Sequence, residues 1–242
     1  MEFLKGIYSV PGEKCIFIKD LDLIAISDLQ LGEELYLAKE LQMYAPQKQL
    51  EKEIKQLESI KNKVKASRLL INGDLKHEFS ELNRQESREI NAFLKRAEEL
   101  FKEIIIIRGN HDNFLVSLLK NKYALLEYYE ESGFLFTHGH KMIDFNNSIH
   151  TIIIGHEEPV ILLRKGFDHV KLPAIVYGKF KSTNLIILPA FSPISEGTPI
   201  NVTNEYNSPF LNKEEILNFK AIGIDEELGE LIFPEISKIY LS

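Results

Sequence analysis

The sequence predicts an α/β fold in which two β-sheets pack against each other and helices cover the outside. Short apolar runs rich in β-branched residues recur along the whole chain of 242 residues. In the first half they alternate with segments of helical period, which is typical of a largely parallel sheet. In the second half they follow one another with little helical pattern, which is typical of a mostly antiparallel sheet. No linker or repeat separates the halves, so we expect one domain over residues 1–242.

Four apolar runs in the first half are predicted as strands that are buried on both faces, because they lack alternation with polar residues. They are segments 16–18, 23–26, 69–71 and 104–107. Between them, apolar residues recur with helical period in segments 50–64 and 90–101. The order of strand, helix and strand predicts right-handed crossovers between parallel neighbours.

Five further apolar runs are predicted as the strands of the second sheet. They are segments 134–136, 152–154, 160–163, 174–177 and 185–188. The stretch from Asn201 to Asn212 is the most loop-like part of the chain, because it is rich in Asn and in other turn-forming residues.

Composition excludes several classes of protein. The net charge is −7, from 29 Lys and Arg against 36 Asp and Glu, so the chain as a whole lacks the basic surface of a dedicated nucleic-acid binder, although a local basic groove remains open. A single cysteine, Cys15, excludes internal disulfides, Cys-x-x-Cys redox pairs and cysteine-based zinc sites. With neither a secretory leader nor a long apolar run, we expect a cytoplasmic protein that does not associate with membranes.

The apolar runs end in polar residues of the types that bind metal ions. The polar segments are 27–30, 72–74, 108–112, 137–140 and 155–158. In open α/β sheets, ligands bind beyond the carboxyl ends of the strands. A single such residue, such as His169, is best interpreted as an ordinary loop residue. Unrelated loops would not repeatedly place Asp, Asn or His at equivalent strand ends, so the set as a whole predicts a metal site.

These segments, taken in order, resemble the motif set of the calcineurin-like metallophosphoesterases. The motifs stand here as Asp28-x-Gln30, Gly73-Asp74, Gly109-Asn110-His111-Asp112, His138-Gly139 and Gly155-His156-x-Glu158. The phrases at 73–79, 155–159 and 188–192 are similar to a branch that includes the bacterial ligase-associated phosphoesterases. The resemblance implies a four-layer αββα sandwich with two mixed β-sheets, in agreement with the pattern of elements.

The resemblance also implies a centre for two divalent metal ions. Asp74 matches the carboxylate that bridges the ions, and the other ligands of the first ion match Asn110, His138 and His156. The second ion would share Asp74 with Asp28, Gln30 and Glu158, but family members usually have histidines at the last two positions. An all-oxygen site suits Mn²⁺ or Mg²⁺ better than Zn²⁺. We therefore expect manganese, with iron, zinc, nickel and magnesium as alternatives. The other interpretation is that the altered site is weak or empty.

Three further histidines are candidates for the chemistry. His111 matches the family histidine that contacts the phosphoryl group and protonates the leaving oxygen. His77 is either a partner that orients His111 or a surface residue that leads into a helix. His140 has no expected metal role, which leaves a hydrogen bond to a ligand or a contact with substrate.

The predicted function is that of a metal-dependent phosphoesterase. Attack by a metal-bound hydroxide would hydrolyse phosphodiesters, nucleotide or nucleic-acid diesters among them, or phosphomonoesters. The alternative is a catalytically reduced member of the family that binds a nucleotide or a protein partner through the same cleft, because Gln30 and Glu158 replace the usual histidines. The chain lacks a phosphate loop, a Gly-x-Gly-x-x-Gly motif and a His-Glu-x-x-His motif. Nucleotide-driven motors, dinucleotide oxidoreductases and zincin proteases are therefore disfavoured.

Overall fold

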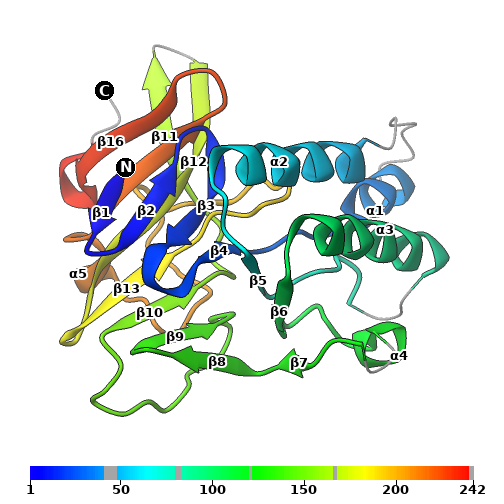
Figure 1. Ribbon diagram of the computed structural model, residues 1–242. Helices are drawn as coiled ribbons and strands as arrows, with labels where there is room; N and C mark the ends of the chain where they lie inside the picture. Colours follow the sequence, from blue (N-terminus) through cyan, green and yellow to red (C-terminus); the bar gives the residue numbers. More distant parts are fainter. Residues whose placement is uncertain (41–47, 80–82, 120–121, 166–167, 240–242) are drawn as a thin grey trace.

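Two mixed β-sheets lie face to face in the computed structural model, which describes residues 1–40, 48–79, 83–119, 122–165 and 168–239 (Figure 1). The first sheet has the order β1-β2-β3-β4-β5-β6-β7. Its strands are β1 (Glu2–Leu4), β2 (Ile7–Val10), β3 (Glu13–Ile18), β4 (Leu23–Ile26), β5 (Arg68–Asn72), β6 (Glu103–Ile107) and β7 (Leu125–Leu126). Strands β1 to β4 pair antiparallel, whereas β4, β5, β6 and β7 pair parallel. The predicted parallel sheet in the first half is therefore confirmed for β4 to β6.

The second sheet has the order β14-β11-β12-β13-β10-β9-β8, with β15 and β16 continuing from β12. Its strands are β8 (Tyr128–Glu131), β9 (Phe134–Thr137), β10 (Thr151–Ile154), β11 (Pro159–Lys165), β12 (Asp168–Phe180), β13 (Thr183–Ile187), β14 (Thr198–Pro199), β15 (Lys220–Asp225) and β16 (Gly229–Glu235). Most pairs are antiparallel, as expected, but β10 pairs parallel with both β9 and β13, and β11 pairs parallel with β14. The sequence pattern did not reveal this parallel centre, because the crossover from β9 to β10 contains no helix.

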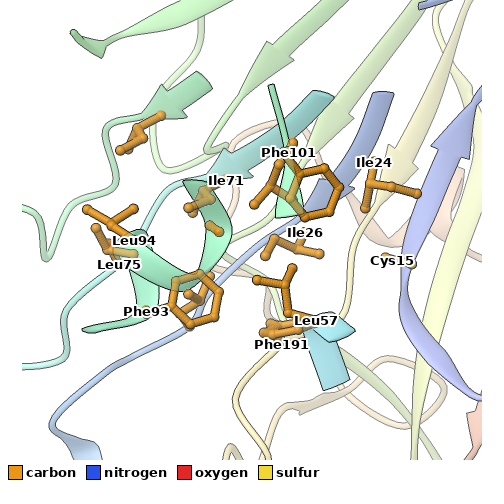
Figure 2. Packing of buried hydrophobic residues seen from close by; sticks show 14 of the residues in the cluster. Cys15, Ile24, Ile26, Leu57, Ile71, Leu75, Phe93, Leu94, Phe101 and Phe191 are labelled. Carbon is orange, nitrogen blue, oxygen red and sulfur yellow. The ribbon is translucent and has the colours of Figure 1, made fainter. Parts of the chain in front are cut away.

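The longer helices of the chain pack on the outer face of the first sheet, whereas the short helix at 213–216 lies on the second sheet. The helices are α1 (Glu33–Glu40), α2 (Gln49–Lys63), α3 (Arg84–Leu100), α4 (Leu115–Leu119) and α5 (Lys213–Ile216), with 3-10 turns at Lys19–Leu21 and Ile236–Lys238. Asn83 caps α3, because its side chain accepts hydrogen bonds from the backbone N–H groups of Gln85 and Glu86. In return, the Glu86 side chain accepts a hydrogen bond from the backbone N–H of Asn83. Leu57 of α2 and Phe93 of α3 pack with Ile24, Ile26 and Ile71 of the sheet (Figure 2).

A second apolar layer lies between the sheets. Successive residues of β4 alternate, so that Leu23 and Ala25 face the second sheet while Ile24 and Ile26 face the helices. This double burial explains the continuous apolar run in the sequence. The outer face of the second sheet is covered by α5, by the 3-10 turn at Ile236–Lys238 and by irregular chain, which includes Phe210. The fourth layer of the sandwich is therefore present, but it contains little helix.

The carboxyl ends of the central strands meet where the two sheets face each other. Ile26, Ile71 and Ile106 are in register on β4, β5 and β6. Asn72, the last residue of β5, is fully buried, and its Nδ2 donates to the carbonyl oxygens of Thr137 at 3.0 Å and Ile153 at 3.3 Å. These bonds tie the ends of the first sheet to β9 and β10 of the second.

Among the described helices, none has the length and apolar content needed to cross a membrane.

Candidate active site

The loops at this edge hold an unusual backbone conformation. Nine non-glycine residues in the described part of the chain have positive φ, and five of them are candidate site residues. These five are Asp28 (φ 54°), Gln30 (53°), Asp74 (49°), His156 (64°) and Glu158 (48°). The left-handed region is unfavourable for residues with a Cβ, and such residues cluster at functional sites. The loops are therefore bent so that these side chains converge.

Two glycines allow the loops to approach one another. A Cβ added at Gly109 would lie 2.0 Å from Asp74 Oδ1 and 2.3 Å from Asp74 N. A Cβ at Gly155 would lie 1.8 Å from the Ser27 hydroxyl oxygen. The motif glycines are therefore needed for close packing around the acidic side chains.

Asp74, His138 and His156 form a cluster suited to a transition-metal ion. One ligand atom from each residue lies within 4.8 Å of the others. His138 Nε2 lies 3.3 Å from Asp74 Oδ2 and 3.1 Å from Asn110 Oδ1. His138 Nδ1 donates to the Asn72 carbonyl oxygen at 2.9 Å, which turns Nε2 toward the cluster. Two imidazoles, a carboxylate and an amide oxygen are a donor set that fits manganese, iron or zinc.

Asp28, Gln30 and Glu158 lie beside this cluster and fit a second ion less well. Asp28 is fully buried and accepts hydrogen bonds from the Ser27 hydroxyl at 2.6 Å and the His156 N–H at 3.1 Å. Gln30 directs Nε2 at Asp74 Oδ2 (3.3 Å) and Glu158 Oε1 (3.2 Å). The amide N–H groups thus lie between two carboxylates, where a cation would otherwise be expected. An ion bound by Gln30 would require the amide to turn so that its oxygen faces the carboxylates.

Electrostatics at the cluster follow from burial and close opposite charges. Burial disfavours the charged form of Asp74, but the adjacent His138 outweighs burial and lowers the pKa of Asp74 to about 2. Burial likewise acts against protonation of His138, but Asp74 and Asp28 raise its pKa to about 10. For His156, burial and the His138 charge lower the pKa to about 4. Burial raises the pKa of Glu158. The site is therefore a buried cluster in which the neighbouring carboxylates favour the protonated form of His138.

His111 stands next to the cluster with its orientation fixed. Its backbone N–H donates to Asp74 Oδ1 at 2.9 Å, and its Nε2 lies 3.8 Å from Asp74 Oδ2. Its Nδ1 hydrogen-bonds to the backbone carbonyl oxygen of His77. The His77 ring is 5.9 Å from the His111 ring, and its Nδ1 donates to Gln30 Oε1 at 3.2 Å. His77 therefore contacts His111 through its backbone carbonyl, while its imidazole bonds to Gln30.

The remaining expected residue, His140, lies against both candidate imidazole ligands. Its ring is 5.3 Å from that of His138 and 6.0 Å from that of His156. Its Nδ1 is buried and has no hydrogen-bond partner among the described residues. Burial and the His138 charge lower the pKa of His140 to about 4, so the ring is neutral at neutral pH.

The structure adds residues that the sequence did not single out. Asp112 accepts from the backbone N–H groups of Leu75 and Gly109, both at 2.8 Å, and so fastens two of the site loops together. Ser195 donates its hydroxyl to Glu158 Oε2. The candidate site opens into a cleft of about 410 Å³. Glu33 lines this cleft, and burial raises the pKa of Glu33 to about 7. Only Asp112 had a signal in the sequence, as the last residue of a motif.

Comparison with known proteins identifies the family. The family model described as calcineurin-like phosphoesterase matches residues 21–223. The chain belongs to this family. Nuclease MPE of Pseudomonas putida has a similar fold and aligns with a TM-score of 0.62 and 18% identity over 91% of this chain and 93% of that chain. A phosphoesterase from E. coli, Yfce, aligns with a TM-score of 0.43 and 16% identity over 73% of this chain and 83% of that chain. A search of curated proteins found no match.

Proposed function

We propose that the protein is a metal-dependent phosphodiesterase, with nucleic-acid or nucleotide diesters as the preferred substrates and phosphomonoesters as secondary ones. The observation that carries the proposal is the convergence of Asp74, His138 and His156 within 4.8 Å, with His111 beside them. The fold shared with a protein named as a nuclease supports a nucleic-acid substrate.

The first group of residues has the geometry of a metal site. Asp74, Asn110, His138 and His156 would hold one divalent ion, with His138 losing the Nε2 proton that it carries in the ion's absence. When bound, the ion supplies a water that is deprotonated near neutral pH and neutralises charge on the phosphoryl oxygens. A pKa of about 4 keeps His156 in the neutral form that a ligand requires.

In this proposal, His111 supplies the proton for the leaving oxygen. The bond from Nδ1 to the His77 carbonyl requires hydrogen on Nδ1, because the carbonyl oxygen can only accept. The proton that is transferred must therefore come from Nε2 of the imidazolium. After transfer, the leaving oxygen is a hydroxyl and His111 is a neutral ring with hydrogen on Nδ1. General-acid assistance of this kind typically contributes about 10²–10⁴-fold to the rate.

A second ion, manganese first among the candidates, would be held by Asp28, Asp74 and Glu158 with Gln30 turned to present its oxygen. The position of the Gln30 amide between Asp74 and Glu158 supports an alternative function. In that alternative the second ion is absent, and the cleft binds a nucleotide or a protein partner without hydrolysis.

Turnover of bis(p-nitrophenyl) phosphate by protein purified without chelator and supplied with Mn²⁺ tests the proposal. We expect activity above a metal-free control and loss of both bound metal and activity in Asp74→Asn. Asp144→Asn is the matched control, because Asp144 is exposed and lies in the loop between β9 and β10, outside the cleft. Wild-type protein that binds Mn²⁺ but shows no turnover would refute the enzymatic function and favour the binding module.

A further inference from the structure

An exposed row of aromatic rings lies beside the candidate acid. The Phe79 ring is 4.1 Å from the His111 ring, and the Tyr36 ring of α1 is 5.0 Å from the His77 ring. With the two imidazoles 5.9 Å apart, four rings lie in the order Tyr36, His77, His111 and Phe79. Phe79 is 49% exposed and Tyr36 is 39% exposed. Both outer rings therefore present apolar surface to solvent next to the site.

Burial in a core does not explain these exposed rings. Isolated exposed apolar residues are common in proteins, but these rings adjoin one another and a candidate catalytic group. Exposed apolar surface beside a functional site is commonly associated with ligand binding.

The charge of the cleft indicates which kinds of contact a substrate could make with it. Among the described residues that line the cleft, none is Lys or Arg, whereas four are glutamates. These are Glu33, Glu157, Glu158 and Glu196. Nucleic-acid binders usually obtain most of their affinity from basic side chains on phosphates. A phosphodiester in this cleft therefore needs other contacts, and the adjacent rings offer stacking, which every nucleobase can accept.

We propose that Phe79 and Tyr36 form a base-stacking subsite on the leaving-group side of the centre and that the substrate is single-stranded nucleic acid. The proposal rests on the function given above. Because the proposed function has His111 protonate the leaving oxygen and the Phe79 ring is 4.1 Å from the His111 ring, the nucleoside attached to that oxygen would lie closest to Phe79. A base inside a duplex is already stacked and paired, so it must be flipped out, which costs free energy, before it can lie against a protein ring. The subsite therefore selects unpaired strands over duplexes.

Binding by Mn²⁺-loaded protein tests the subsite, with fluorescein-labelled phosphorothioate strands whose integrity is checked by gel electrophoresis after each titration. The probes are a short oligothymidylate and a strand of equal length and charge that carries abasic residues. We expect tighter binding of the thymidylate strand, by roughly 5- to 150-fold for one stacked base. Phe79→Leu should lose this preference, whereas Phe79→Trp should keep it because an aromatic face remains. Tyr36→Leu provides a second, independent variant.

Equal affinity of the wild type for the two strands would overturn the subsite, as would a preference that survives in both leucine variants. Binding of a thymidine–adenine duplex as tight as that of the single strand would overturn it as well. Turnover of bis(p-nitrophenyl) phosphate by the wild type separates this outcome from failure of the proposed function. Turnover without a base preference refutes only the subsite, and a base preference without turnover refutes only the hydrolytic function.

Discussion

Replacing Gly109 with alanine should disable the metal site while leaving every candidate ligand in the sequence. The added Cβ would lie 2.0 Å from Asp74 Oδ1 and 2.3 Å from Asp74 N, whereas ordinary contacts begin at 3.4 Å. The first contact must therefore open by about 1.4 Å (3.4 − 2.0). Rotation of the Asp74 side chain cannot relieve the contact with its backbone nitrogen. Metal–ligand distances tolerate only about 0.2 Å, so Asp74 would leave the position of a ligand.

Gly178→Ala is the matched control for this variant. Gly178 lies on β12, and an added Cβ there would lie 2.2 Å from the ring of the buried Phe219. Both variants overpack the fold and should each lose about 1–3 kcal/mol of unfolding free energy. Titration calorimetry of metal-free protein with Mn²⁺ measures the effect on metal affinity. Relative to the wild type, we expect an affinity that is weaker by roughly 10- to 100-fold or more for Gly109→Ala and unchanged for Gly178→Ala. Wild-type stoichiometry and affinity in Gly109→Ala would refute the assignment of Asp74 as a ligand.

Three further predictions concern individual side chains. His111→Ala should retain Mn²⁺ but lose about 10²–10⁴-fold in turnover of alkyl diesters, with a smaller loss for nitrophenyl diesters; equal losses would contradict the acid role. Gln30→His with Glu158→His should shift the metal preference from manganese toward zinc or nickel in a non-additive way, and effects that simply multiply would show that the two positions do not share an ion. Burial raises the pKa of Glu157 from 4.5 to about 7, so the folded state keeps a proton that the unfolded state releases. Stability of the metal-free protein should therefore fall between pH 4.5 and 7, by up to about 3 kcal/mol, and urea unfolding of Glu157→Gln should show a flatter pH dependence.

The sequence was sufficient to predict which strand ends form the edge where the candidate site lies, because strand ends are a local property, but it did not single out Glu33 or Ser195. The run at 23–26 is apolar throughout, and Ser27 and Asp28 follow it, so both the buried strand and its polar end could be inferred. Parallel neighbours share one edge of a sheet, so residues after β4, β5 and β6 were expected to meet.

The orientation of side chains could not be predicted in the same way, because it depends on neighbours from other loops. Gln30 directs its amide nitrogen at Asp74 and Glu158 because His77 donates to the amide oxygen, and these four residues span 128 positions in the chain (158 − 30). The contact from the His77 carbonyl to His111 likewise has no signature in residue type, since every residue has a carbonyl. The position of Tyr36 against His77 depends on the path of α1, which a sequence pattern does not determine.

At the site residues with a left-handed backbone, stability of the fold and the proposed function favour different side chains. At Gln30 and Glu158, with φ of 53° and 48°, a glycine would adopt the same backbone conformation without steric cost. Each such replacement should relieve about 1–2 kcal/mol of backbone strain in the folded protein and at the same time remove a side chain of the proposed second metal site. A selection for thermal resistance alone would therefore enrich variants that lack this proposed site, and engineering for stability has to exclude these positions from its library.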